Sequence, residues 1–310
     1  MNLQTTRCGE SFGHLQIVRI PIRIGLAMGL LFLASCGGPG PAQALPGTLY
    51  LGTGNRILEL NLQTHRIQTV IHLPDHLRVD VLSIVSRNLL LVSTYPQHTI
   101  DLLNLKTRHW TPLRSGWKAV AFPYRHRFVF YDTVKPGLYA ERLYWASFRD
   151  PQVRHLIDPG PFPIPIPVIR LGAGRFLYTS WRKTHEQALW IHNLESGSFR
   201  KFPVPLTYPE LRLSHNAILC SAVGVKTYPY FNYDLTSGAQ IRIHLPAWYT
   251  PVRNIPALHG FLVGKHSSSL FVSPGRRWTL YLDLWHTGHR ILLLKHTRVG
   301  LDTVVWTGPR

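Results

Sequence analysis

The sequence predicts an all-β fold: a six-bladed β-propeller over residues 47–308, closed by its C-terminal strand. The main observation is a phrase that recurs six times, in which an apolar strand, a tight polar turn and another apolar strand follow each other. The apolar anchors of the copies are 43, 43, 46, 41 and 49 residues apart, namely Leu62, Leu105, Phe148, Leu194, Leu235 and Leu284. Strand repeats of this length are typical of β-propellers. Abundant aromatic and β-branched residues also favour strands.

The closure prediction comes from the first repeat and the chain end. Blade one offers only three strands of its own, at 48–52, 56–61 and 66–71. The segment 301–306 is a spare strand, and we expect it to supply the missing innermost strand of blade one. Such pairing leaves no open edge between the first and last blades.

Each remaining blade is expected to contain four strands, a to d, from the centre outward. Blade two has them at 79–85, 89–94, 99–105 and 108–113, and blade three at 117–122, 128–133, 143–148 and 153–157. Blade four has them at 166–171, 175–181, 188–194 and 199–204, and blade five at 210–214, 218–223, 228–235 and 240–245. Blade six has them at 251–255, 261–266, 278–285 and 290–296.

The hairpin Asn232-Tyr233-Asp234-Leu235-Thr236-Ser237-Gly238 is the clearest copy of the phrase. It resembles the turn of WD40-like and YVTN-like propeller repeats. The resemblance covers residues 47–306, although no Trp-Asp dipeptide recurs and the Gly is missing from the first three copies. It implies a propeller that binds partners, and it identifies no substrate.

The N-terminus reads as an export signal. Residues 1–23 carry Arg7, Arg19 and Arg23, and the apolar, uncharged segment 24–35 follows them. That apolar segment is too short for a membrane span, so we expect residues 1–35 to be a signal peptide. The last three residues of this segment and the cysteine that follows, Leu33-Ala34-Ser35-Cys36, resemble the lipobox of bacterial lipoproteins.

The lipobox resemblance implies that Cys36 is acylated and holds the protein on a bilayer of the cell envelope, with residues 36–46 as a flexible tether. A rival cleavage after Ala44, at an A-x-A site, would instead release a soluble periplasmic or secreted protein. The sequence does not indicate which membrane would hold the anchor.

Charge points to an acidic partner or to an acidic habitat. The chain has 34 Lys plus Arg against 15 Asp plus Glu, a net charge of +19. Removing residues 1–35 takes away three Arg and one Glu, which leaves +17. Such an excess attracts acidic proteins or anionic envelope polymers. A chain with few carboxylates also suits an acidic medium, so both interpretations stay open. Export argues against a nucleic-acid partner, and the sequence does not indicate the oligomeric state.

We expect the binding face on the long b–c and d–a connections, because binding residues favour irregular loops on a rigid scaffold. Their basic residues are Lys135, Arg142, Arg182, Lys183, Lys226, Lys265, Arg276 and Arg277. Polar residues expected at the channel mouth, where each a strand begins, are Asp80, Lys118, Arg212, Arg253 and Asp302. The alternative for these residues is simple charge neutralisation within the channel.

The favoured function is therefore a binding or scaffold module without a cofactor. The runner-up is an enzyme, a hydrolase, lyase or oxidoreductase, with Asp80 or Asp302 as acid or base and Lys118, Arg212 or Arg253 stabilising charge. A weaker alternative is metal or redox-cofactor handling by the 17 histidines, grouped most tightly at His72 and His76 and at His286 and His289. No nucleotide-binding or hydrolase motif occurs.

Overall fold

The computed structural model divides the chain into two compact units, Met1–Gln43 and Ala44–Arg310. The structure describes residues 45–64, 66–133, 141–157, 168–172, 174–181, 187–202, 207–214, 216–222, 230–243, 249–255, 260–266, 278–284, 290–297 and 304–307. All of them belong to the second unit. The predicted signal peptide, Cys36 and most of the predicted tether lie outside these ranges. No helix among the described residues is long and apolar enough to cross a membrane.

The described strands form six four-stranded antiparallel sheets. The first contains β24 (Val304–Thr307), β1 (Thr48–Thr53), β2 (Arg56–Asn61) and β3 (Ile67–His72). The second contains β4 (Arg78–Ser86), β5 (Leu89–Tyr95), β6 (Thr99–Asn104) and β7 (Trp110–Ser115). The third contains β8 (Trp117–Phe122), β9 (Arg127–Thr133), β10 (Glu141–Ser147) and β11 (Arg154–Leu156).

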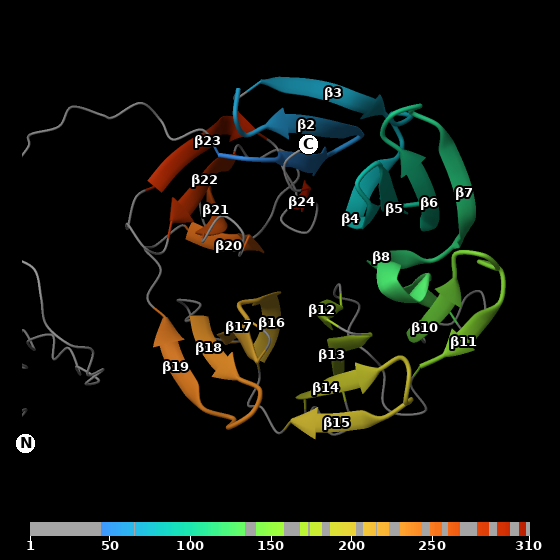
Figure 1. The fold of residues 1–310 in the computed structure, drawn as a ribbon, viewed down its shortest axis with the longest axis vertical. Coiled ribbons are helices and arrows are strands. Elements are labelled where there is room, and N and C mark those ends of the chain that lie inside the picture. The colour runs from blue at the N-terminus through green and yellow to red at the C-terminus, as the bar shows by residue number, and fades with distance from the viewer. Residues whose placement is uncertain are drawn as a thin grey trace, which may run out of the picture. The chain divides into compact units, whose positions relative to one another are not determined.

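The remaining sheets have the same order of strands. The fourth contains β12 (Ile169–Gly172), β13 (Arg175–Trp181), β14 (Gln187–Asn193) and β15 (Phe199–Phe202). The fifth contains β16 (Thr207–Arg212), β17 (Ala217–Ala222), β18 (Tyr230–Asp234) and β19 (Gln240–Ile243). The sixth contains β20 (Tyr249–Ile255), β21 (Gly260–His266), β22 (Trp278–Leu284) and β23 (Arg290–Thr297). Figure 1 shows β4, β8, β12, β16, β20 and β24 as the innermost strands. The prediction of an all-β propeller is confirmed.

The C-terminal strand pairs with the first sheet, as the sequence predicted. In this antiparallel pairing Val304 lies opposite Leu51, Val305 opposite Tyr50 and Trp306 opposite Leu49. Both valines are buried. A strand from the end of the chain therefore completes the sheet that holds the first strands, and the inner edge of β1 is covered.

The recurring phrase has a physical basis in hydrogen bonds at its turn. The side chains of Asn61 and Asn104 each accept hydrogen bonds from two backbone N–H groups of the turn that follows, at 2.9 to 3.1 Å. Asp234 does the same for Thr236 and Ser237. Short polar side chains that bond to the nearby backbone in this way stabilise tight turns.

The apolar anchor after each of these residues ties two turns together. The backbone N–H of Leu105 donates to the carbonyl of Asn88, and that of Phe148 donates to the carbonyl of His126. Leu62, Leu194 and Leu235 make equivalent bonds to Gly47, Gly174 and Asn216. In the second to fifth sheets these bonds join the turn between the outer two strands to the turn between the inner two. Both kinds of turn therefore lie at the same end of these four sheets, which we call the turn face.

The core consists of apolar clusters between successive sheets. Leu49 and Leu60 of the first sheet pack with Ile255 and Leu293 of the sixth. The next clusters join the first sheet to the second, the second to the third, the third to the fourth and the fourth to the fifth. The first four sheets therefore bury side chains from both of their faces, which stabilises the arrangement.

Candidate functional site: a cationic turn face

Five of the innermost strands carry a β-bulge. The pairing register shifts between Val79 and Val81 in β4, and between Trp117 and Val120 in β8. It shifts at corresponding places in β12, β16 and β20. A bulge turns a side chain away from the regular alternation of a strand. Charged residues lie at or beside these shifts, so the bulges affect how charge is placed along the innermost strands.

Two of the predicted channel residues are in contact. Asp80 and Lys118 lie near the starts of β4 and β8, and Lys118 Nζ donates to Asp80 Oδ1 at 2.7 Å. Both side chains are largely buried, with exposed fractions of 18% and 21%. A carboxylate is thus within hydrogen-bonding distance of a cation, as the enzyme hypothesis requires. The pair equally fits the alternative in which these charges only neutralise each other.

The prediction placed Arg212 at the wrong end of its strand. We expected the strand to begin at residue 210, but β16 runs from Thr207 to Arg212, so Arg212 is its last residue. Its Nε–H donates to the backbone carbonyl of Ser214 in the turn that follows, at 2.9 Å. Arg212 therefore lies on the turn face, whereas Asp80 and Lys118 lie towards the opposite end of their strands.

The other predicted residues are only partly covered by the structure. Arg253 is in β20, where only its backbone is described, and Asp302 is outside the described residues. Arg142 and Lys265 belong to strands β10 and β21 and not to loops, which corrects that part of the prediction. Arg142 is in a strand because the β9–β10 ladder extends to the pair Asp132–Arg142 and beyond. The remaining basic-loop residues lie outside the described ranges, namely Lys135, Arg182, Lys183, Lys226, Arg276 and Arg277.

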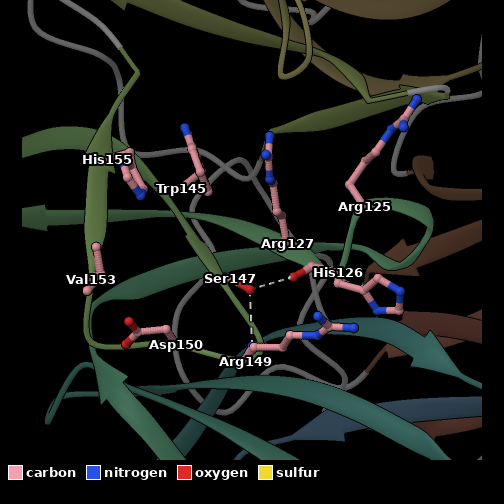
Figure 2. Close-up of a pocket in the computed structure, with 9 residues that line it drawn as sticks. All are labelled: Arg125, His126, Arg127, Trp145, Ser147, Arg149, Asp150, Val153 and His155. Atoms are coloured by element: carbon pink, nitrogen blue, oxygen red, sulfur yellow. Dashed lines mark hydrogen bonds between the residues drawn. The ribbon is translucent and has the colours of Figure 1, made fainter.

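The turn face of the third sheet contains an open pocket of about 380 Å³ (Figure 2). Its lining comes from the 3₁₀ turn η1 (Pro123–Arg125), the start of β9, the end of β10, the following turn and β11. The lining residues are Arg125, His126, Arg127, Trp145, Ser147, Arg149, Asp150, Val153 and His155. Three arginines and two histidines therefore surround a space to which Asp150 contributes the only carboxylate among these nine residues.

Local hydrogen bonds fix the two turns that form this pocket. His126 ends η1 in the left-handed conformation, with φ of 50°, and its N–H donates to the carbonyl of Pro123. The carbonyl of His126 accepts from Ser147 Oγ at 3.4 Å, and Ser147 Oγ accepts from the N–H of Arg149 at 3.1 Å. The dashed lines in Figure 2 show these two bonds. Ser147 thus does here what Asn and Asp do in other copies of the turn.

Aromatic stacking holds one side of the pocket. The rings of Trp145 and His155 stack with centroids 4.0 Å apart and planes 15° apart. The guanidinium of Arg127 lies 4.1 Å from the centre of the Trp145 ring, and its Nη1 donates to the carbonyl of Leu194 at 3.0 Å. A cation over an indole face is held by the quadrupole of the ring. Arg127 is therefore fixed in place by the protein.

The other two arginines of the pocket, Arg125 and Arg149, differ in whether a carboxylate compensates their charge. Arg125 forms an ion pair with Glu195 of the fourth sheet, where both side chains are partly exposed. Arg149 is exposed and has no carboxylate partner among the described residues. A guanidinium presents a planar set of N–H donors that fits carboxylate, phosphate or sulfate. The pocket therefore has the chemistry to bind an anionic group, with Arg149 as its most available charge.

Sequence reasoning missed this pocket because it looked for function in the longest loops. The signals that identify it are the run Arg125-His126-Arg127 in one short turn and Arg149 in the next. The Phe148 anchor joins those turns. Metal binding has no support in the described ranges, where no three His, Cys, Asp or Glu residues gather. Asp75, which lies between His72 and His76 in the sequence, accepts a hydrogen bond from the Asn55 side chain at 2.9 Å.

The fold defines a class, an all-β propeller similar to TolB structures. A TolB of Acinetobacter baumannii superposes with a TM-score of 0.64 at 13% identity, covering 85% of this chain and 67% of that one. A TolB-type protein of Agrobacterium tumefaciens gives 0.62 at 11% identity, covering 84% and 98%. A chain of a nidogen/laminin complex gives 0.61 at 11%, covering 84% and 97%. No protein-family model and no curated protein matches the chain. At these identities the similarity shows the fold alone.

Proposed function

We propose that this chain is a lipid-anchored, extracytoplasmic binding and scaffold module, a propeller with six blades that captures an acidic protein or an anionic polymer of the cell envelope. The observation that carries the proposal is the pocket on the third sheet, where Arg125, Arg127 and Arg149 face a space of about 380 Å³. Such a group of guanidiniums favours carboxylate-rich or phosphate-rich partners. The net charge of +19 adds long-range attraction.

Location is the second part of the proposal and rests on the N-terminal sequence. Acylation of Cys36 would keep the propeller on a membrane, while cleavage after Ala44 would release it. Membrane fractionation of cells that express the full chain and its Cys36→Ala variant separates these alternatives. We expect the variant to leave the membrane fraction. An unchanged distribution would contradict the lipid anchor.

The binding test uses a charge reversal in the pocket and a matched reversal elsewhere. Lys106 follows the anchor Leu105 just as Arg149 follows the anchor Phe148, and both are exposed. We expect wild-type protein to bind fluorescent poly-L-glutamate, with affinity falling as salt rises. Arg149→Glu should weaken binding by about tenfold. Lys106→Glu should have less than about a twofold effect.

Two results would overturn the assignment of the pocket. The first is an equal loss in both variants, which would mean that only net charge matters. The second is binding that does not change between low and high salt. If binding is salt-sensitive but Arg149→Glu behaves as wild type, the basic b–c and d–a loops become the candidate, with Arg182 and Lys183 as the first residues to change.

A further inference from the structure

Three arginines come together where the innermost strands of the fourth and fifth sheets reach the turn face. Arg170 is in β12, Arg175 begins β13 after a tight turn, and Arg212 ends β16. None of them lines the pocket on the third sheet. A Cβ atom built on Gly172 would lie 3.7 Å from Arg212 Nη1. The guanidinium of Arg212 therefore lies close to the backbone of β12 at Gly172, which stands between Arg170 and Arg175 in the sequence.

Backbone acceptors anchor two of these guanidiniums. Arg170 Nη1 donates to the carbonyl of Ala121 in the third sheet at 3.2 Å, and Arg212 Nε donates to the carbonyl of Ser214 at 2.9 Å. A guanidinium has five N–H donors in a rigid plane, so the bond to Ala121 orients Arg170 without using its whole donor set. For Arg170 and Arg175 no carboxylate partner is present among the described residues.

The cations raise each other's free energy. Burial lowers the pKa of Arg212, and the positive charges of Arg170 and Arg175 lower it further. Burial also lowers the pKa of Arg170. Like charges that are held together by packing and partly shielded from water repel each other. An anion between them would replace this repulsion with attraction, and a doubly charged anion would do so most effectively.

We infer that Arg170, Arg175 and Arg212 form a binding site for a small, doubly charged oxyanion, of the class of inorganic phosphate or a phosphate monoester. Two guanidiniums from neighbouring strands hold the oxygens in a bidentate manner, and Arg175 adds a third positive charge. The site takes a small ligand and works independently of the acidic partner proposed for the third sheet.

The test is a titration of the full chain with inorganic phosphate at constant ionic strength, in which calorimetry measures binding and thermal unfolding measures stabilisation. We expect saturable binding and an unfolding temperature that rises with phosphate, because a ligand of the native state stabilises it. Arg170→Gln and Arg212→Gln should each weaken binding by about tenfold. Arg170→Lys should recover only part of the loss, because lysine keeps the charge and lacks the fork.

Lys106→Gln is the control, because Lys106 is exposed and belongs to neither site, and it should bind phosphate as wild type does. Arg149→Gln tells whether phosphate binds in the pocket on the third sheet instead. Absence of saturable binding in wild type overturns the inference. So does a loss of binding in Arg149→Gln with none in the Arg170 and Arg212 variants. Circular dichroism identifies a variant that fails to fold, and Arg170→Lys then serves as the test. A parallel titration with glycerol 1-phosphate tells the sources apart, since tighter binding than inorganic phosphate assigns the site to a monoester.

Discussion

The third and fourth sheets differ in whether their cations have carboxylate partners. At the third sheet, carboxylates compensate three cations. Lys118 pairs with Asp80 of the second sheet, and Asp132 contacts both Arg154 and Arg114 of the second sheet. In the fourth sheet Arg170 and Arg175 have no carboxylate among the described residues. The chain has only 15 acidic residues for 34 basic ones. The positions of the few carboxylates therefore indicate which cations are compensated within the fold and which remain available to a ligand.

Asp132 is the centre of the compensated region. Arg114, which comes from the second sheet, reaches it at 3.3 Å, and Arg154 contacts the same carboxylate oxygen. The guanidinium of Arg114 also lies 4.4 Å from the Phe130 ring centre, and that of Arg154 lies 4.6 Å from the centre of Tyr144. The two rings stack on each other. One carboxylate thus fixes two cations and the packing between two sheets.

The largest expected effect comes from removing that carboxylate. Asp132→Ala leaves Arg114 buried beside a second cation, and a buried pair broken in this way costs about 3–5 kcal/mol. The measurement is the free energy of unfolding in urea. Asp150→Ala is the control, because Asp150 is exposed and should cost less than about 0.5 kcal/mol. A cost below about 1 kcal/mol for Asp132→Ala would mean that the network does not stabilise the fold.

The next effect concerns the fourth sheet, which buries a neutral histidine where the third buries ion pairs. His192 packs 4.3 Å from the Phe199 ring centre and 5.4 Å from that of Phe176. Burial lowers its pKa from 6.5 to about 4, against a smaller opposing effect of a hydrogen bond to the Ser198 backbone. In the unfolded chain the group titrates near 6.5, so the unfolded state binds more protons between these values.

Stability from His192 is therefore full above pH 6.5 and is lost as pH falls towards 4, by about 3 kcal/mol in total. Urea unfolding at pH 7, 5.5 and 4.5 measures the loss, and His192→Phe should flatten it. His72→Gln, at an exposed site in β3, should leave the slope as in wild type. A wild-type curve that is flat over this range contradicts the effect and favours the acidic-habitat interpretation of the low carboxylate content.

The sequence was sufficient to predict the structural elements that repeat. The Asn-Leu and Asp-Leu turns and their anchors make the same hydrogen bonds in several sheets, and the spare terminal strand had one vacant place beside Leu49–Leu51. It was not enough for Arg212, because the strand was expected to begin at residue 210, after Pro209, whereas β16 begins at Thr207. Proline lacks an N–H and is tolerated at edges and bulges. Pro209 lies within β16, the inner edge of its sheet, at a register shift.

The pocket escaped prediction for a different reason. It is made from two of the shortest turns, and its cations become neighbours only because Phe148 bonds to His126 across those turns. Spacing in the sequence shows that Arg127 and Arg149 exist, but it does not show that Trp145 places one of them. Contacts of this kind depend on the twist and register of one sheet, which periodicity does not determine.

The smallest expected effect comes from leaving Lys118 of the third sheet without its carboxylate, as Arg170 and Arg175 of the fourth sheet are among the described residues. Asp80→Asn removes the charge that compensates Lys118 while keeping the shape of the side chain. The pair is partly exposed, so the cost is about 1 kcal/mol, measured by urea unfolding. The same variant should strengthen the binding of poly-L-glutamate slightly, by less than about twofold, since it adds one net positive charge. A loss above about 3 kcal/mol would show instead that the Asp80–Lys118 pair stabilises the fold as strongly as Asp132 does. The third and fourth sheets would then differ in their binding surfaces, but not in how an uncompensated charge on an innermost strand affects stability.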